Sequence, residues 1–302
     1  MLDIEKIKLD FNESNLLKSP ENQTTKRIFI AATKMNDGKT TTSLGLYSAL
    51  NDSKKSIGFI KPIGQRSVDI NGQKIDEDSF LFNETFNVKT PIEAMSPIVI
   101  YKNFTKQFLE DPDLIQPRLI DFLCKSFDRA AYEKDYIIIE GTGHAGVGSI
   151  FNLSNAKVAK TLKAKVIMVS SGGIGSPIDQ ISLNQALFAK EGVDIIGVII
   201  NKVNPEKIDY IKHYCEIALN RMGLKLLGCI PDNKNLSVPN FPQVINQIKG
   251  NWINKKDSLE IRKISKIIIG AKAKAAKSII ENIGRETLLI TSFDRDDIIK
   301  SL

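Results

Sequence analysis

Residues 27–41 read RIFIAATKMNDGKTT, and this stretch decides the fold. After Arg27 the first residues form a short apolar run, which is typical of a strand that is buried on both faces. A polar turn follows, and Gly38, Lys39 and Thr40 lead into a segment over 41–50 that predicts a helix. A strand, a turn of inward-pointing backbone N–H groups, a lysine and a hydroxyl at a helix start together suit the phosphates of a nucleotide. Residues 27–50 therefore predict a phosphate-binding unit.

This arrangement is a P-loop, in which Gly38, Lys39 and Thr40 supply the last three positions and Thr33 replaces the first glycine. The alternative is a chance G-K-T in a surface turn. We expect Lys39 to act catalytically on the terminal phosphates and Thr40 to be a ligand of Mg²⁺. The residues expected to bind the nucleotide here are Thr33, Lys34, Asn36, Asp37, Gly38, Lys39, Thr40 and Thr41.

Five further short apolar runs follow along the chain, separated by amphipathic segments. They are SIGFIK (56–61), YIIIE (136–140), KVIMVS (165–170), DIIGVII (194–200) and LKLLGCI (224–230). This alternation predicts an α/β fold with a doubly wound, mostly parallel sheet of the P-loop NTPase type. In such sheets ligands bind beyond the carboxyl ends of the strands, so the loops after these runs are where the chemistry is expected.

The pattern divides the chain into three parts. We expect a polar N-terminal leader over 1–25, the P-loop domain over 26–238, and a second, smaller α/β domain over 239–302. In the last part we expect a helix over 242–249, a strand over 265–270, a helix over 273–281, a strand over 286–291 and a helix start at 294. Residues 71–107 lack a regular alternation and suggest an inserted loop.

The composition narrows the choice of partners and location. The 302 residues include 42 Lys and Arg against 35 Asp and Glu, a net charge of +7, but no basic block appears, so nucleic acid is not expected as the main partner. The apolar runs are much shorter than the roughly 20 residues that span a bilayer, so no membrane segment is expected. The N-terminus lacks the apolar core of a secretion signal, and three cysteines with two histidines show no zinc spacing. We expect a cytoplasmic protein with reduced thiols.

Polar side chains end two of the predicted strands. Lys61, beside the P-loop, is a candidate catalytic residue because a cation there would neutralise charge on a transferring phosphoryl group. Glu140 follows three isoleucines, and a metal ion would justify a carboxylate at that position. An exposed strand-end lysine and an ordinary strand-end acid are the alternatives.

A third strand ends at Asn201, in the sequence Asn201-Lys202-Val203-Asn204. This sequence resembles the base-reading N-K-x-D of GTPases, with Asn204 in place of the aspartate. A carboxylate accepts two N–H bonds from guanine whereas an amide offers one acceptor, so adenine is favoured. Asn201 is therefore a candidate nucleotide-binding residue, or it caps the strand end.

Five motifs occur in a fixed order: Thr33 in the loop, Lys61-Pro62, Glu140-Gly141-Thr142-Gly143, Asn201, and Leu227-Gly228-Cys229-Ile230-Pro231. Over residues 26–238 they resemble the dethiobiotin synthetase family, whose domain recurs in cobyrinic acid a,c-diamide synthases and at the N-terminus of long phosphotransacetylases. The resemblance implies ATP and Mg²⁺ as cofactors, with Thr40, Glu140 and an acid of the 76–78 cluster, best matched by Asp78, as metal ligands. A helix N-terminal acid that serves the helix dipole is an equal explanation for Asp78.

The same resemblance implies a homodimer and phosphorylation of a carboxylate or carbamate of a small molecule. The alternatives are an ATP-sensing module that binds ATP alone, and a partitioning-type ATPase in which Lys34 would reach the partner subunit's phosphates. His144 lies in a glycine-rich loop after Glu140 and is either a substrate contact or a structural histidine.

The end of the chain, Leu288-Leu289-Ile290-Thr291 running into Asp294-Arg295-Asp296-Asp297, resembles the opening of a DRTGG domain. It has Asp296-Asp297 where threonine and glycine would stand. The resemblance implies that residues 239–302 correspond to only part of such a domain, and we expect a regulatory rather than a catalytic role for them.

Overall fold

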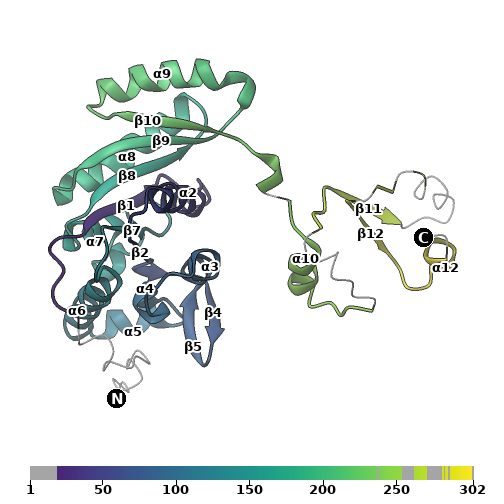
Figure 1. Cartoon of the computed structure of the whole chain (residues 1–302), viewed down its shortest axis with the longest axis horizontal. Coiled ribbons are helices and arrows are strands. Elements are labelled where there is room, and N and C mark those ends of the chain that lie inside the picture. The colour runs from purple at the N-terminus through teal and green to yellow at the C-terminus, as the bar shows by residue number, and fades with distance from the viewer. Residues whose placement is uncertain are drawn as a thin grey trace. The chain divides into compact units, whose positions relative to one another are not determined.

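The computed structural model describes residues 19–236, 238–253, 262–270, 281, 283–284 and 286–300. The chain forms two compact units, one that ends at Asp232 and one that begins at Asn233. Figure 1 shows the elements of both units, and each unit is described separately below.

A six-stranded sheet forms the centre of the first unit (Figure 1). Its order is β10-β9-β8-β1-β7-β2, and every neighbouring pair of strands is parallel. The strands are β1 (Lys26–Ala32), β2 (Ile57–Ile60), β7 (Tyr136–Glu140), β8 (Lys165–Ser171), β9 (Ile195–Val203) and β10 (Leu226–Pro231). The predicted doubly wound α/β fold is confirmed, and each of the six predicted runs forms a strand.

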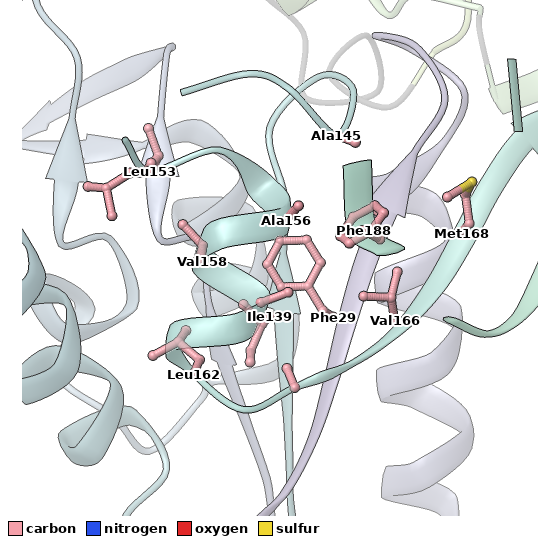
Figure 2. Packing of buried hydrophobic residues seen from close by; sticks show 14 of the residues in the cluster. Phe29, Ile139, Ala145, Leu153, Ala156, Val158, Leu162, Val166, Met168 and Phe188 are labelled. Atoms are coloured by element: carbon pink, nitrogen blue, oxygen red, sulfur yellow. The ribbon is translucent and has the colours of Figure 1, made fainter. Parts of the chain in front are cut away.

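The strands are apolar on both sides because each face of the sheet carries its own core. Phe29 of β1 belongs to one buried cluster and the next residue, Ile30, to the other. Figure 2 shows the first cluster, in which Phe29 and Ile139 of the sheet lie among Ala156 and Val158 of α7. Side chains of successive strand residues point to opposite faces, so a continuous apolar run serves both cores.

The helices that cover this sheet are α2 (Lys39–Asp52), α6 (Pro112–Ala130), α7 (Asn155–Thr161), α8 (Gly175–Glu191) and α9 (Ile208–Arg221). Among the described residues, 3₁₀ helices include η2 (Ser149–Phe151) and η3 (Pro205–Lys207) in the first unit and η4 (Lys234–Leu236) in the second. Among the described helices, none combines the length and apolar character needed to cross a membrane.

The loop expected over 71–107 is largely regular structure, so that prediction is wrong. The antiparallel pair β4 (Ser67–Ile70) and β5 (Gln73–Asp76) leads into α3 (Glu77–Phe86). Further on come α4 (Ile92–Met95), α5 (Phe104–Glu110) and a small parallel pair of β3 (Ile63–Gly64) with β6 (Ile98–Val99). These elements are too short to show a period in sequence, although Phe82 and Met95 are fully buried.

In the second unit, α10 (Phe241–Ile248) precedes a parallel pair of β11 (Lys266–Gly270) and β12 (Thr287–Thr291), and α12 (Asp296–Ile299) follows. These elements match the helix, the two strands and the helix start expected from the sequence. The helix expected over 273–281 lies outside the described residues except for its last position, and so do residues 1–18 of the leader expected over 1–25. The assignment of 239–302 to a DRTGG-like domain stays a prediction.

Candidate nucleotide-phosphate site

The P-loop begins where β1 ends, near the centre of the sheet. Residues 33–38 make the turn into α2, which begins at Lys39. Two residues of the turn are left-handed, Asn36 at φ 65° and Gly38 at φ 98°. A methyl group on Gly38 would lie 2.0 Å from Asn201 Nδ2, so both the backbone angle and the available space require glycine here.

Asp37 holds the turn together from inside. Its carboxylate is only 4% exposed and accepts hydrogen bonds from Thr33 Oγ1 at 2.6 Å, the backbone N–H of Lys34 at 2.8 Å and Ser171 Oγ at 2.5 Å. Thr33, which replaces the first glycine, is therefore bonded within the loop through its hydroxyl. The sequence did not suggest this role for either residue, and their contact with nucleotide stays a prediction.

The end of β9 braces the other side of the turn. Asn201 Nδ2 donates to the carbonyl of Asp37 at 2.9 Å, and Lys202 Nζ donates to the carbonyl of Asn36 at 2.8 Å. Two consecutive carbonyls of the turn are therefore bonded to side chains of β9. Asn201 thus lies against the P-loop, and its predicted contact with the base stays untested.

Gly38→Ala is expected to destabilise the protein by about 1–3 kcal/mol, because alanine at a left-handed φ is strained and its methyl group would displace Asn201. Thermal denaturation measures the effect. Gly45→Ala is the matched control: Gly45 lies in α2 with nothing within 4 Å of an added Cβ, and alanine favours helices by about 0.5–1 kcal/mol. Equal stability of the two variants would contradict the role of Gly38.

Lys39 lies at the start of α2 with its charge directed into the site. Its Nζ donates to the carbonyl of Gly143, in the loop after β7, at 3.0 Å. Burial and the neighbouring Lys61 cation lower the pKa of Lys39 from its ordinary value. An anion at this position would relieve both effects, as a nucleotide phosphate does in a P-loop.

Lys61, Asp78, Glu140 and Thr40 form one connected group. Lys61 Nζ lies 2.6 Å from Asp78 Oδ2 and 2.9 Å from Glu140 Oε1. Thr40 Oγ1 hydrogen bonds to Asp78 Oδ1 at 3.1 Å and to Glu140 Oε1 at 2.9 Å. The structure therefore brings together the residues that the sequence predicted separately for catalysis and metal binding.

Burial and charge act against each other in this group. Burial raises the pKa of Glu140, which is fully buried, and the Lys61 cation works against that rise. Burial would also lower the pKa of Lys61, but Glu140 and Asp78 outweigh it and raise the pKa. For Asp78, burial raises the pKa, but the Lys61 cation and the side-chain hydrogen bonds with Lys61, Thr40 and Glu140 together outweigh burial and lower it. The lysine is thus held as a cation between two carboxylates.

Of the three acids over 76–78, Asp78 is the one bonded to this group. Asp76 instead caps α3, with its Oδ1 accepting from the backbone N–H of Asp78 at 2.9 Å. Burial raises the pKa of Asp76 to about 7. Glu77 is exposed. Asp78 thus lies in the first turn of α3 and bonds Thr40 and Lys61, and its role as a metal ligand stays a prediction.

The donor set suits Mg²⁺. One carboxylate oxygen, Glu140 Oε2, is buried without a hydrogen bond of good geometry to the described part of the chain, and the Thr40 hydroxyl lies beside the other. Hard divalent cations prefer such oxygen ligands, and Mg²⁺ usually takes one or two carboxylates together with substrate phosphates. The described residues contain no cluster of three or more His, Cys, Asp or Glu side chains that could hold a metal alone. The residues present therefore fit a cation shared with a nucleotide.

Some of the residues predicted to bind the nucleotide are open to solvent. Lys34 and Thr41 both have exposed side chains. His144 is exposed as well, and its Nδ1 accepts from the backbone N–H of Gly146 at 3.2 Å. A cross-subunit role for Lys34 and a homodimer stay predictions.

Two buried asparagines that the sequence did not single out shape the loop after β7. Asn155 of α7 accepts from the backbone N–H of Thr142 and donates to the carbonyls of Thr142 and His144. Asn184 of α8 accepts from the backbone N–H of Ala145. Asn184 shares the buried stripe of α8 with Ile181 and Phe188, and an amide at a core position of a helix was the signal that could have identified it.

A family model described as an AAA domain, AAA_26, matches residues 26–240. The chain belongs to this family. The match contains the P-loop and every residue of the group around Lys61, so the AAA_26 domain carries the whole candidate site.

Curated relatives of this AAA_26 chain include phosphate acetyltransferases and dethiobiotin synthetases. Phosphate acetyltransferase of Pseudomonas aeruginosa is 30% identical over 289 residues, covering 90% of this chain and 39% of that protein. The same enzyme of Nitrosomonas europaea is 26% identical, covering 90% and 38%. ATP-dependent dethiobiotin synthetase BioD 2 of Salmonella typhimurium is 28% identical over 207 residues, covering 67% of this chain and 82% of that protein. The chain thus spans less than two fifths of the length of the phosphate acetyltransferases it matches.

Solved structures with a similar fold include the septum site-determining protein MinD of Pyrococcus horikoshii, at 19% identity and a TM-score of 0.41, covering 70% of this chain and 84% of that chain. A putative plasmid partition protein of Borrelia burgdorferi has 17% identity and a TM-score of 0.44, covering 78% and 94%.

Proposed function

We propose that this chain is an Mg²⁺-dependent ATP-binding protein that phosphorylates a carboxylate or carbamate of a small molecule in a synthetase reaction. The observation that carries the proposal is Lys61, held by Asp78 and Glu140 directly beside Thr40 of the P-loop. Positioning and charge stabilisation are what phosphoryl transfer requires of a protein, and this group supplies both.

In the proposed reaction, a carboxylate or carbamate oxygen attacks the γ-phosphorus of ATP and ADP leaves with the electron pair. An amine then attacks the carbonyl carbon of the mixed anhydride, and phosphate leaves. The P-loop and Lys39 bind the phosphates, and Lys61 neutralises the charge on the transferring group. Bound Mg²⁺, held by Thr40, Asp78 and Glu140, would supply further charge neutralisation. The described residues show no serine or cysteine paired with a histidine, so no covalent enzyme intermediate is proposed.

The dethiobiotin synthetase match supports this proposal, since its named activity is ATP-dependent and it covers 67% of this chain. The identity of the acid is left open. The region over 71–107 packs against the sheet beside Lys61, with the backbone N–H of Lys61 bonded to the carbonyl of Met95 at 2.8 Å, and is a candidate for the substrate side.

The experiment is ADP release from Mg–ATP across a panel of small carboxylic acids with amines and bicarbonate, repeated with hydroxylamine to trap an acyl phosphate as a hydroxamate. We expect slow basal hydrolysis that rises with the right acid, together with hydroxamate formation. If ATP binds but no acid stimulates turnover, the synthetase proposal fails.

The second candidate is an ATP-sensing module without turnover. The observation in its favour is that the phosphate acetyltransferase match covers 90% of this chain, which is more than the first unit alone contains. The same ADP-release assay separates the two candidates, because a sensor binds ATP without acid-stimulated turnover. A partitioning-type ATPase would instead respond to DNA.

We predict that ATP binds more tightly than GTP. Asn204 has an amide where guanine readers have a carboxylate, and its Oδ1 already accepts from the backbone N–H of Glu206 at 3.0 Å. Competition binding measures the preference, and Asn204→Asp should narrow it. Equal or stronger binding of GTP to the unaltered chain would contradict the adenine assignment.

A further inference from the structure

The Asn184 side chain joins two segments of the site that are far apart in sequence. It is 7% exposed, and its Oδ1 accepts from the backbone N–H of Ala145 at 2.7 Å. Its Nδ2 donates to the carbonyl of Thr33 at 3.3 Å and to the carbonyl of Gln180 at 2.8 Å. One amide on α8 therefore bonds the first residue of the P-loop and the loop after β7 at the same time.

The loop after β7 is the one that Lys39 contacts. Gly143, whose carbonyl accepts from Lys39 Nζ, lies two residues before Ala145. Asn155 fixes the inner shape of the same loop from α7 through its bonds to Thr142 and His144. The two asparagines thus have different tasks: Asn155 shapes the loop, whereas Asn184 attaches it to the P-loop.

We propose that Asn184 is a positioning residue that couples residues 141–148 to the P-loop, so that the two segments respond to a bound nucleotide as one unit. The inference rests on the proposed function, since it requires nucleotide at the P-loop. Asn184 acts through backbone groups and makes no direct contact with the reacting atoms. Backbone displacements of about 1 Å near reacting groups lower rates about 100-fold, so this link has a kinetic effect.

The test is hydrogen–deuterium exchange of peptides covering 33–38 and 141–148, with and without ATP and Mg²⁺. In the unaltered chain, ATP slows exchange in both peptides. In Asn184→Leu, which keeps the bulk and loses every hydrogen bond, ATP still slows exchange over 33–38, but protection over 141–148 falls at least about threefold. Asn184→Asp keeps the acceptor for Ala145 and loses the donor to Thr33, so it is also expected to uncouple the two segments. It provides the test if Asn184→Leu does not fold.

Gln185→Leu is the matched control, because Gln185 is the neighbouring amide on α8 and bonds the carbonyl of Met222, away from the site. In Gln185→Leu, the protection of both peptides by ATP should equal that in the unaltered chain. ADP release is expected to fall at least about tenfold in Asn184→Asp with the ATP dissociation constant changed less than threefold.

Two results would overturn the inference. Full ATP protection of both peptides in Asn184→Asp would show that Asn184 does not couple residues 141–148 to the P-loop, and the proposed function would be unaffected. Absence of ATP protection in the unaltered chain would instead remove the proposed function and the inference with it.

Discussion

Lys61→Ala is expected to lower acid-stimulated ADP release about 100- to 1000-fold while the ATP dissociation constant changes less than about threefold. The lysine is 6% exposed and bonds Asp78 and Glu140, so its charge is held beside Thr40 of the P-loop rather than free in solution. Charge held in place near a transferring group acts on the transition state more than on ground-state binding. Steady-state kinetics together with calorimetric titration of ATP separate the two effects.

Lys61→Ala also leaves the carboxylates of Asp78 and Glu140 close together without a cation. Loss of one partner of a buried ion pair lowers the free energy of unfolding by about 3–5 kcal/mol. Lys61→Gln keeps hydrogen-bond donors and provides a second variant in case Lys61→Ala does not fold. Both variants should lose turnover. Acid-stimulated turnover retained within about fivefold in a folded variant would contradict a catalytic role for Lys61.

Lys39→Ala is expected to weaken ATP binding by about 1.5–3 kcal/mol, or roughly 10- to 150-fold, because it removes a charge-assisted bond to the terminal phosphates. Burial and Lys61 lower the pKa of Lys39, so removing the charge of the free protein relieves a cost, which opposes the stability lost with the bond from Lys39 to the Gly143 carbonyl. Calorimetry measures the affinity, and thermal denaturation measures the stability.

Lys55→Ala is the control for Lys39→Ala, because Lys55 is an exposed lysine before β2 and outside the site. It should bind ATP like the unaltered chain. Unchanged ATP affinity in Lys39→Ala would contradict the assignment of residues 33–40 as a nucleotide-binding P-loop.

Much of the fold could be predicted because parallel strands buried on both faces leave a plain trace in sequence. The run Ile137-Ile138-Ile139 is fully buried, with neighbouring residues in different cores. The region over 71–107 left no such trace, because its elements are short and each buries only one or two side chains. Phe82, for example, stacks on Phe59 with ring centroids 3.7 Å apart, a contact between segments that no local pattern reveals.

The candidate site likewise contains some residues that the sequence predicts and others that it does not. The closeness of Lys39, Thr40, Lys61 and Glu140 was predictable because they lie at or beyond the carboxyl ends of strands, which meet at one edge of a parallel sheet. The residues that support them were not. Asp37, Asn155 and Asn184 act through hydrogen bonds to backbone groups that are 3 to 151 residues away in sequence. A polar residue at a buried helix position, as in α8, is the only local sign of such a role.

Calorimetric titration of ATP with and without Mg²⁺ tests most directly whether Thr40, Asp78 and Glu140 hold a cation shared with ATP. In the unaltered chain we expect Mg²⁺ to strengthen ATP binding at least about tenfold, and in Glu140→Gln we expect most of that gain to be lost because a charged oxygen ligand is removed. ATP affinity that does not depend on Mg²⁺, or a gain of equal size in Glu140→Gln, would contradict the account.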